Sequence, residues 1–291
     1  MRRFNYMVEI DSGPVLLNLG SLVLSWHGIF SFIAVASAVF LVGRWAPMRG
    51  LDPDDIYSIA VWGIIGGIIG ARLVHVIDNL DIYLDNPTQI IAIWTGGIGV
   101  WGGILGGFIG GAGYAALMKY PVGVVADLTA PAMLFAQSIG RLGDIVNGEH
   151  CSRATSQFFG FIWTHGESAA RYCANGIGVP VQPVIGLEIL WNLSCLLVIW
   201  KLRNRLRPAG MLFAMYLALY SVGRFLVTFL REDRIWAVGL QEAHFIAILV
   251  LVITVPVLAF RARIGNSEAV IEEFAQLAPR GSRAERRRRD N

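Results

Sequence analysis

Residues 140–150, GRLGDIVNGEH, place an arginine, two carboxylates and an amide side by side at the end of a long apolar run. The Arg141 guanidinium is permanently charged, and its planar fork suits phosphate. Asp144 lies one helical turn away, which favours an ion pair that holds Arg141 still. Asn147 and Glu149 follow, and Glu149 is in a position to pin the loop. The segment therefore predicts a site for a charged, phosphate-containing group.

Other apolar runs carry further polar side chains at helical spacing. Residues three, four or seven apart lie on one face of a helix, so they form stripes. The stripes are Gln137, Arg141 and Asp144; Tyr216, Tyr220 and Arg224; and Glu188 with Asn192. We expect these stripes to line a polar cavity inside a helical bundle.

The elements that position these side chains are membrane helices. The 291-residue chain is 55% hydrophobic and 15% charged, whereas soluble domains carry about 25% charged residues. Apolar runs of about 20 residues are long enough to cross a bilayer, and without two-residue alternation they are helices. Their many glycines favour close helix packing. The sequence predicts an all-α polytopic membrane protein with seven spans, at about 22–43, 56–77, 94–118, 124–147, 183–200, 210–230 and 241–260.

The loop charges predict the orientation. One side of the membrane receives 15 of the 24 Lys and Arg residues and the other receives 6, so the basic side is cytoplasmic. The N-terminus is then outside and the C-terminus inside. We expect a seven-helix membrane domain over residues 1–265, an extracytoplasmic loop at 148–182 and a basic cytoplasmic tail at 266–291. The N-terminus lacks the pattern of a removable signal peptide.

With this orientation, five ionisable residues from five helices fall in the outer half of the membrane. They are His27, Arg72, Arg141, Glu188 and Arg224. Ionisable residues inside spans are costly and indicate function. For Arg72 alone, snorkelling or a packing contact explains the residue equally well. Several arginines at head-group depth indicate a phospholipid head-group site.

Several motifs resemble the prolipoprotein diacylglyceryl transferase family over nearly the whole chain. GRLGDIVNGEHCS is similar to the signature G-R-x-G-N-F-x-N-x-E-x-x-G, and GRFLVTFLRED resembles the segment with two arginines seven apart, Arg224 and Arg231. GAR at Arg72, GGIGVWGG, VQPVIGLEIL and SWHGI resemble further family motifs. The chain departs from the pattern where it has His27 for Tyr, Trp101 for His, Asp144 for Asn, Ile145 for Phe, Ser152 for Gly, Gln182 for His and Thr228 for Glu.

The resemblance implies transfer of the diacylglyceryl group of phosphatidylglycerol to the lipobox cysteine of a prolipoprotein signal peptide in the bacterial plasma membrane. The leaving phosphate needs fixed cations, for which Arg141 and Arg224 are the candidates. The thiol reacts as thiolate, and the candidate bases are His27, Asp144 and Glu149. The catalytic set is Arg141, Arg224, Glu149 and Asp144. The substrate-binding set is Arg72, Asn147, Trp101, His27, Tyr220, Glu188 and Arg231.

Two other functions stay open. The departures at Trp101, Asp144, Gln182 and Thr228 are compatible with a non-catalytic relative that binds phospholipid or lipoprotein precursors. A small transporter fits less well, because we find neither internal repeats nor polar residues at mid-membrane. We expect no metal, no cofactor and no nucleic-acid partner, and membrane lipids as the surroundings.

Two smaller predictions concern the loop at 148–182. Cys151 and Cys173 share this loop, which we expect to face an oxidising space, so a disulfide is predicted, with two free thiols as the alternative. His150 and His165 are interpreted as ordinary solvated loop residues.

Overall fold

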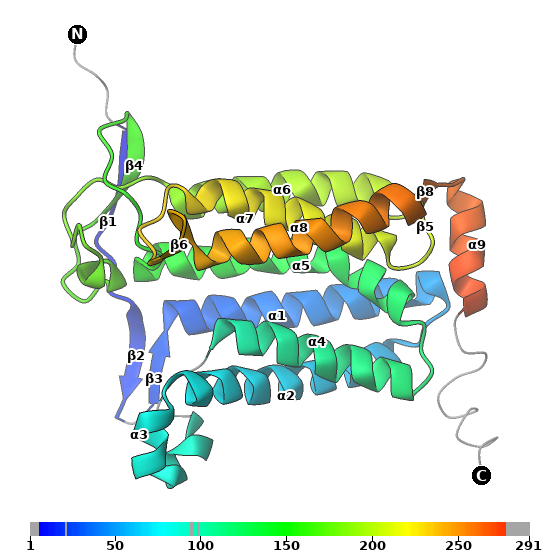
Figure 1. Cartoon of the computed structure of the whole chain (residues 1–291), viewed down its shortest axis with the longest axis horizontal. Coiled ribbons are helices and arrows are strands. Elements are labelled where there is room, and N and C mark those ends of the chain that lie inside the picture. The colour runs from blue at the N-terminus through cyan, green and yellow to red at the C-terminus, as the bar shows by residue number, and fades with distance from the viewer. Residues whose placement is uncertain (1–5, 21, 94–95, 98, 278–291) are drawn as a thin grey trace. The chain divides into compact units, whose positions relative to one another are not determined.

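The computed structural model describes residues 6–20, 22–93, 96–97 and 99–277 and is mostly helical, as predicted (Figure 1). In this part of the chain, seven helices are long and apolar enough to cross a membrane, which confirms the predicted number of spans. They are α1 (Trp26–Trp45), α2 (Pro53–Asp78), α4 (Val100–Leu117), α5 (Val122–Asn147), α6 (Val184–Leu202), α7 (Met211–Thr228) and α8 (Glu242–Arg261). The helix expected from residue 94 begins only at Val100.

By its internal contacts the chain forms two compact units. Unit 1 comprises Met1–Phe40 and Asp127–Asn266, and unit 2 comprises Leu41–Ala126 and Ser267–Asn291. The predicted basic tail begins with a helix that the sequence did not predict, α9 (Ser267–Leu277). The rest of that tail, from residue 278, lies outside the described residues.

In unit 1, α5, α6, α7 and α8 run alongside one another (Figure 1). Their apolar faces share a buried core, to which α5 contributes Leu134, α6 contributes Ile199 and α7 contributes Leu212. The start of α7 is held by a buried carboxylate of α5. The Asp127 oxygens accept hydrogen bonds from the backbone N–H groups of Gly210 (2.8 Å) and Phe213 (2.9 Å), which have no partner within the helix.

Short strand pairs, absent from the sequence prediction, flank the helices of unit 1. β1 (Tyr6–Ile10) pairs in parallel with β4 (Phe159–Trp163), and β2 (Val15–Leu19) pairs antiparallel with β3 (Leu22–Ser25). Two smaller antiparallel pairs join β5 (Leu206–Arg207) to β8 (Arg263–Ile264) and β6 (Ile235–Ala237) to β7 (Leu240–Gln241).

The segment between α5 and α6 is folded around its own core. It contains β4 and the 3-10 helix η4 (Ala169–Tyr172), and Phe161, Trp163 and Val181 pack together inside it. Cys151 and Cys173 form a disulfide, which confirms the predicted bridge. The bridge and the core fix the loop that directly follows the polar end of α5.

In unit 2, glycines allow α2 and α4 to touch through their backbones. A Cβ added at Gly66 or Gly70 would fall inside van der Waals distance of a carbonyl oxygen of α4, at Gly106 and Gly102 respectively. The predicted role of these glycines in close helix packing is confirmed. After α2, the chain continues through α3 (Leu80–Asp85) and the 3-10 helix η2 (Pro87–Ile91).

Candidate active site

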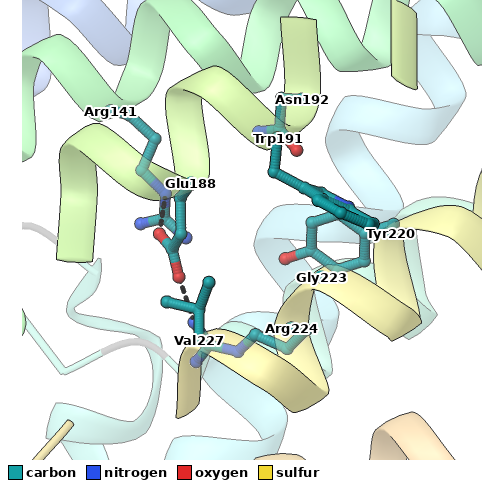
Figure 2. Close-up of a pocket in the computed structure, with 8 residues that line it drawn as sticks. All are labelled: Arg141, Glu188, Trp191, Asn192, Tyr220, Gly223, Arg224 and Val227. Atoms are coloured by element: carbon teal, nitrogen blue, oxygen red, sulfur yellow. Dashed lines mark hydrogen bonds and ion pairs between the residues drawn. The ribbon is translucent and has the colours of Figure 1, made fainter. Parts of the chain in front are cut away.

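Two arginines from different helices share one glutamate at one end of the helices of unit 1. The Nε of Arg141 in α5 lies 2.7 Å from Glu188 Oε2, and the Nη1 of Arg224 in α7 lies 2.9 Å from Glu188 Oε1. Figure 2 shows Glu188, near the start of α6, between the two guanidinium groups. The side chain of Glu188 is 9% exposed and those of the arginines are 19% and 18% exposed. This carboxylate therefore partly neutralises a pair of half-buried cations.

The three predicted polar stripes face one another. Gln137 of α5 donates a hydrogen bond to the Tyr216 hydroxyl of α7 at 2.8 Å. Further along the same faces the side chains line a small pocket: Arg141, Glu188, Trp191, Asn192, Tyr220, Gly223, Arg224 and Val227 (Figure 2). The space inside it, about 10 Å³, is that of a single water molecule. A larger ligand must therefore displace side chains that line the pocket, among which Arg141, Glu188 and Arg224 are joined by ion pairs.

Asp144 is the hub of a second set of contacts beside the arginine pair. One carboxylate oxygen, Oδ1, lies 2.9 Å from His27 Nδ1. The other, Oδ2, lies 2.5 Å from Arg141 Nη1 and 3.0 Å from His150 Nε2. The expected ion pair between Arg141 and Asp144 is present. The carboxylate is almost completely buried, and nitrogen atoms of three side chains surround it.

His150 is part of this network, so its interpretation as a solvated loop residue is wrong. Its Nδ1 lies 3.2 Å from Arg231 Nη2, and its Nε2 lies 2.5 Å from Arg141 Nη1 and 3.0 Å from Asp144 Oδ2. The backbone of His150 is left-handed, with φ of 67°. The sequence offered one signal, the position of His150 directly after Glu149 in the motif.

Arg231 is held on the far side of His150. Its Nε and Nη2 donate to the two oxygens of Asp233, at 2.7 and 3.1 Å, and the side chain is 6% exposed. Gln241 donates to the backbone oxygen of Arg231 at 3.0 Å, which fixes the segment that follows α7. The structure thus brings Arg231 into contact with the Asp144 network through His150.

Asn147 and Glu149 lie at the end of α5. Asn147 Nδ2 donates to Glu149 Oε1 at 2.8 Å, so Glu149 ties the start of the loop to the end of α5. The same Oε1 lies 3.6 Å from His27 Nδ1, and the Glu149 side chain is 31% exposed. Glu149 is therefore a partly exposed carboxylate at the edge of the Asp144 hub.

Two predicted binding residues, Arg72 and Trp101, belong to unit 2. Arg72 is buried and donates to the backbone oxygens of Ile90 (2.8 Å), Gly96 (2.6 Å), Gly97 (2.8 Å) and Gln89. These contacts fix the segment after α3. Trp101, in the first turn of α4, is 38% exposed. A role of either residue in substrate binding stays a prediction.

One group of side chains in the described part of the chain has the composition of a metal site. His27, Asp144 and Glu149 offer donor atoms within 4.8 Å of one another. Both Asp144 oxygens already have imidazole or guanidinium donors, and the contact of 2.9 Å to His27 has the length of a hydrogen bond. We therefore interpret the group as a hydrogen-bonded network. That the chain needs no metal or cofactor stays a prediction.

The chain matches the family model described as prolipoprotein diacylglyceryl transferase over residues 14–260. It is 33% identical over 260 residues to the phosphatidylglycerol–prolipoprotein diacylglyceryl transferase of Dehalococcoides mccartyi, which covers 88% of this chain and 96% of that protein. Proteins of the same name from Staphylococcus aureus (30% over 272 residues, 89% and 90% covered) and Synechococcus elongatus (33% over 245 residues, 82% and 84% covered) are also similar. The match reaches all seven membrane helices and every polar side chain of the Asp144 and Glu188 contacts, and the chain belongs to the prolipoprotein diacylglyceryl transferase family.

Proposed function

We propose that this protein transfers the diacylglyceryl group of phosphatidylglycerol to the cysteine thiol of the lipobox in a prolipoprotein signal peptide. In this reaction the sulfur attacks a glyceryl carbon, the bond from that carbon to a phosphate oxygen breaks, and glycerol phosphate leaves with the electron pair. Negative charge therefore grows on the phosphate. The observation that carries the proposal is the pair of arginines, Arg141 and Arg224, that face one another across Glu188.

The arginine pair suits a phosphodiester that becomes a phosphate monoester. Guanidinium groups fixed by protein contacts are oriented before the charge appears, so they stabilise it without reorganisation. Asp144 fixes Arg141, while Tyr220 and Asn192 line the same pocket and offer neutral hydrogen-bonding groups. The apolar faces of the helices around the pocket suit the acyl chains of the donor.

Glu188 has the role of a resident counter-ion in this proposal. The phosphate of the donor lipid replaces the carboxylate between the two guanidinium groups, and Glu188 moves aside to open the pocket. The exchange keeps the arginines paired with an anion at every stage, which avoids the cost of an unpaired buried charge.

The proposed location is the bacterial plasma membrane, with the site open to the outer leaflet. The excess of Lys and Arg in the loops on the opposite side supports this orientation. The disulfide in the segment between α5 and α6 supports it as well, because disulfides persist in oxidising compartments. Arg72 then holds the outer segment after α3, and Arg231 holds His150 beside the site.

The deciding experiment is transfer by the purified protein. Phosphatidylglycerol labelled in its acyl chains is mixed with a lipobox peptide in lipid nanodiscs, and the peptide is analysed by mass spectrometry. We expect a thioether-linked diacylglyceryl peptide and an equal amount of glycerol phosphate. A peptide with Ser in place of the lipobox cysteine is the control. Binding of the lipid without transfer would instead support the non-catalytic relative.

A further inference from the structure

His27 has the surroundings of an imidazole that accepts a proton. It is the second residue of α1, and its Nδ1 lies 2.9 Å from the Asp144 carboxylate, within hydrogen-bond distance. A carboxylate can only accept, so a ring proton on Nδ1 is favoured beside it, and the lone pair then lies on Nε2. The side chain is 41% exposed although Nδ1 itself is buried, which means that the exposed part of the ring is away from Asp144.

The other ionisable groups of the cluster lack this combination. Asp144 is buried, and its two oxygens lie within 3.0 Å of nitrogen atoms of His27, Arg141 and His150. Both nitrogens of His150 are engaged, by Arg231 and by Asp144. Glu149 is partly exposed, but a carboxylate is in general a weaker base than an imidazole and is further from the ordinary pKa of a thiol, about 8.5. The charged groups around the His27 ring are Asp144, Glu149 and Arg141.

A carboxylate at position 144 can serve His27 and Arg141 at the same time. His27 and Asp144 are in direct contact, at 2.9 Å between Nδ1 and Oδ1. An amide has a single acceptor oxygen, whereas the carboxylate has one oxygen for His27 and another for Arg141 and His150.

We propose that His27 is the general base that deprotonates the substrate thiol, and that Asp144 is the positioning residue that orients it. The inference rests on the proposed function. The Nε2 atom accepts the proton of the lipobox thiol as the sulfur forms its bond to the glyceryl carbon. The electron pair of the broken carbon–oxygen bond stays on the phosphate, and the proton on His27 passes to the departing glycerol phosphate. Asp144 also contacts Arg141, so one carboxylate joins the base to the cation that receives the phosphate.

The test compares two acceptor peptides that differ in one atom. One carries the lipobox cysteine and the other carries selenocysteine, which is ionised at neutral pH and needs no base. The variant is His27→Gln, which keeps the polarity and approximate size of the side chain but cannot take up a proton. General-base removal costs about 10²- to 10⁴-fold in rate. We expect a loss of that order with the thiol peptide and less than about tenfold with the selenol peptide.

Further variants separate catalysis from structure. Asp144→Asn weakens the contacts to both His27 and Arg141, so both peptides react more slowly, and the thiol peptide is expected to lose more. In His27→Ala, added imidazole is expected to restore part of the thiol reaction. His165→Gln, in the loop between α5 and α6, is the matched control and should behave as wild type. Folding of every variant is checked by thermal stability in the same nanodiscs.

The outcomes are distinct. If His27→Gln loses more transfer rate with the thiol peptide than with the selenol peptide, the role of His27 as general base is supported. Equal losses of rate with the two peptides, or no loss with either, would overturn this role and would mean that His27 has only a structural role. The same loss pattern in Glu149→Gln but not in His27→Gln would overturn it in favour of the glutamate. Loss of wild-type activity with a chelator and its return with Zn²⁺ would overturn it in favour of a metal site. Absence of transfer by the wild type on both peptides would overturn the proposed function and this inference with it.

Discussion

Replacing Arg141 by Lys removes the planar fork while it keeps the charge. Arg141 contacts Glu188 through Nε and Asp144 through Nη1, on two different sides of the guanidinium. A lysine ammonium is a single point at the end of a flexible chain, so it can keep one of these contacts in one conformation but cannot be fixed by both. The variant should therefore fold, because Glu188 keeps Arg224 and Asp144 keeps its two histidines.

The expected loss is one of transition-state stabilisation. Removing one preorganised donor to a developing negative charge costs about 2–4 kcal/mol in the barrier. At about 1.4 kcal/mol for each factor of ten, this corresponds to a rate about 30- to 900-fold slower. The same loss is expected for Arg224→Lys. The double variant should lose less than the sum, because both guanidinium groups contact the single carboxylate of Glu188.

The measurement is single-turnover transfer at saturating phosphatidylglycerol, with thermal stability determined beside it. Arg234→Lys is the matched control, because this arginine follows α7 and is exposed. If both Arg141→Lys and Arg224→Lys turn over like the wild type, the arginines are structural and do not stabilise the leaving phosphate. If wild type and variants bind phosphatidylglycerol equally and only transfer is lost, the arginines act in the transition state.

Three further outcomes can be measured. Gly106→Val should separate α2 from α4, because its side chain would meet the backbone of α2, and we expect overpacking to cost about 1–3 kcal/mol, read as a lower midpoint of thermal unfolding. Glu188→Gln should lower the KM for phosphatidylglycerol, because the neutral amide no longer competes with phosphate for the arginines. The midpoint of thermal unfolding should fall, because two half-buried cations lose their counter-ion. An increase in KM would instead mean that Glu188 contributes to substrate binding. The third test uses a protein that keeps the disulfide but lacks the free cysteine, Cys195. In intact cells, His165→Cys should react with a membrane-impermeant thiol reagent and Asn204→Cys should not. The reverse result would mean that the proposed orientation is inverted.

The features that could be predicted from the sequence are those marked by long apolar segments or by polar residues at the spacing of the helical repeat. Each of the seven spans is a continuous apolar segment, so its existence follows from composition alone. The facing stripes follow from the helical repeat, since residues such as Arg141 and Gln137 must lie on one side of α5. Glu188 could be placed with Arg141 and Arg224 because all three lie near the same end of their helices.

The features that could not be predicted depend on distant or backbone partners. β1 pairs with β4, which lies about 150 residues further along the chain, and neither strand has a long alternating pattern. Arg72 donates hydrogen bonds to backbone carbonyl oxygens, which every residue has, so the sequence does not show which residues accept them. His150 has a positive φ of 67°, which is uncommon outside glycine, and the sequence alone does not show which residue adopts it.

Asp144 shows why a departure from a family pattern has to be interpreted together with its neighbours. Taken alone, a carboxylate in place of an amide adds a negative charge next to the cations that bind phosphate, which argues for a weaker enzyme or none. The contacts argue otherwise, because the two oxygens of Asp144 lie next to Arg141, His27 and His150, which offset its negative charge. His27 is itself a departure, and it is the group that a carboxylate, rather than an amide, would orient as a base. The two changes are therefore complementary, and their contact is the physical reason to expect a working transferase despite the missing histidine at Trp101.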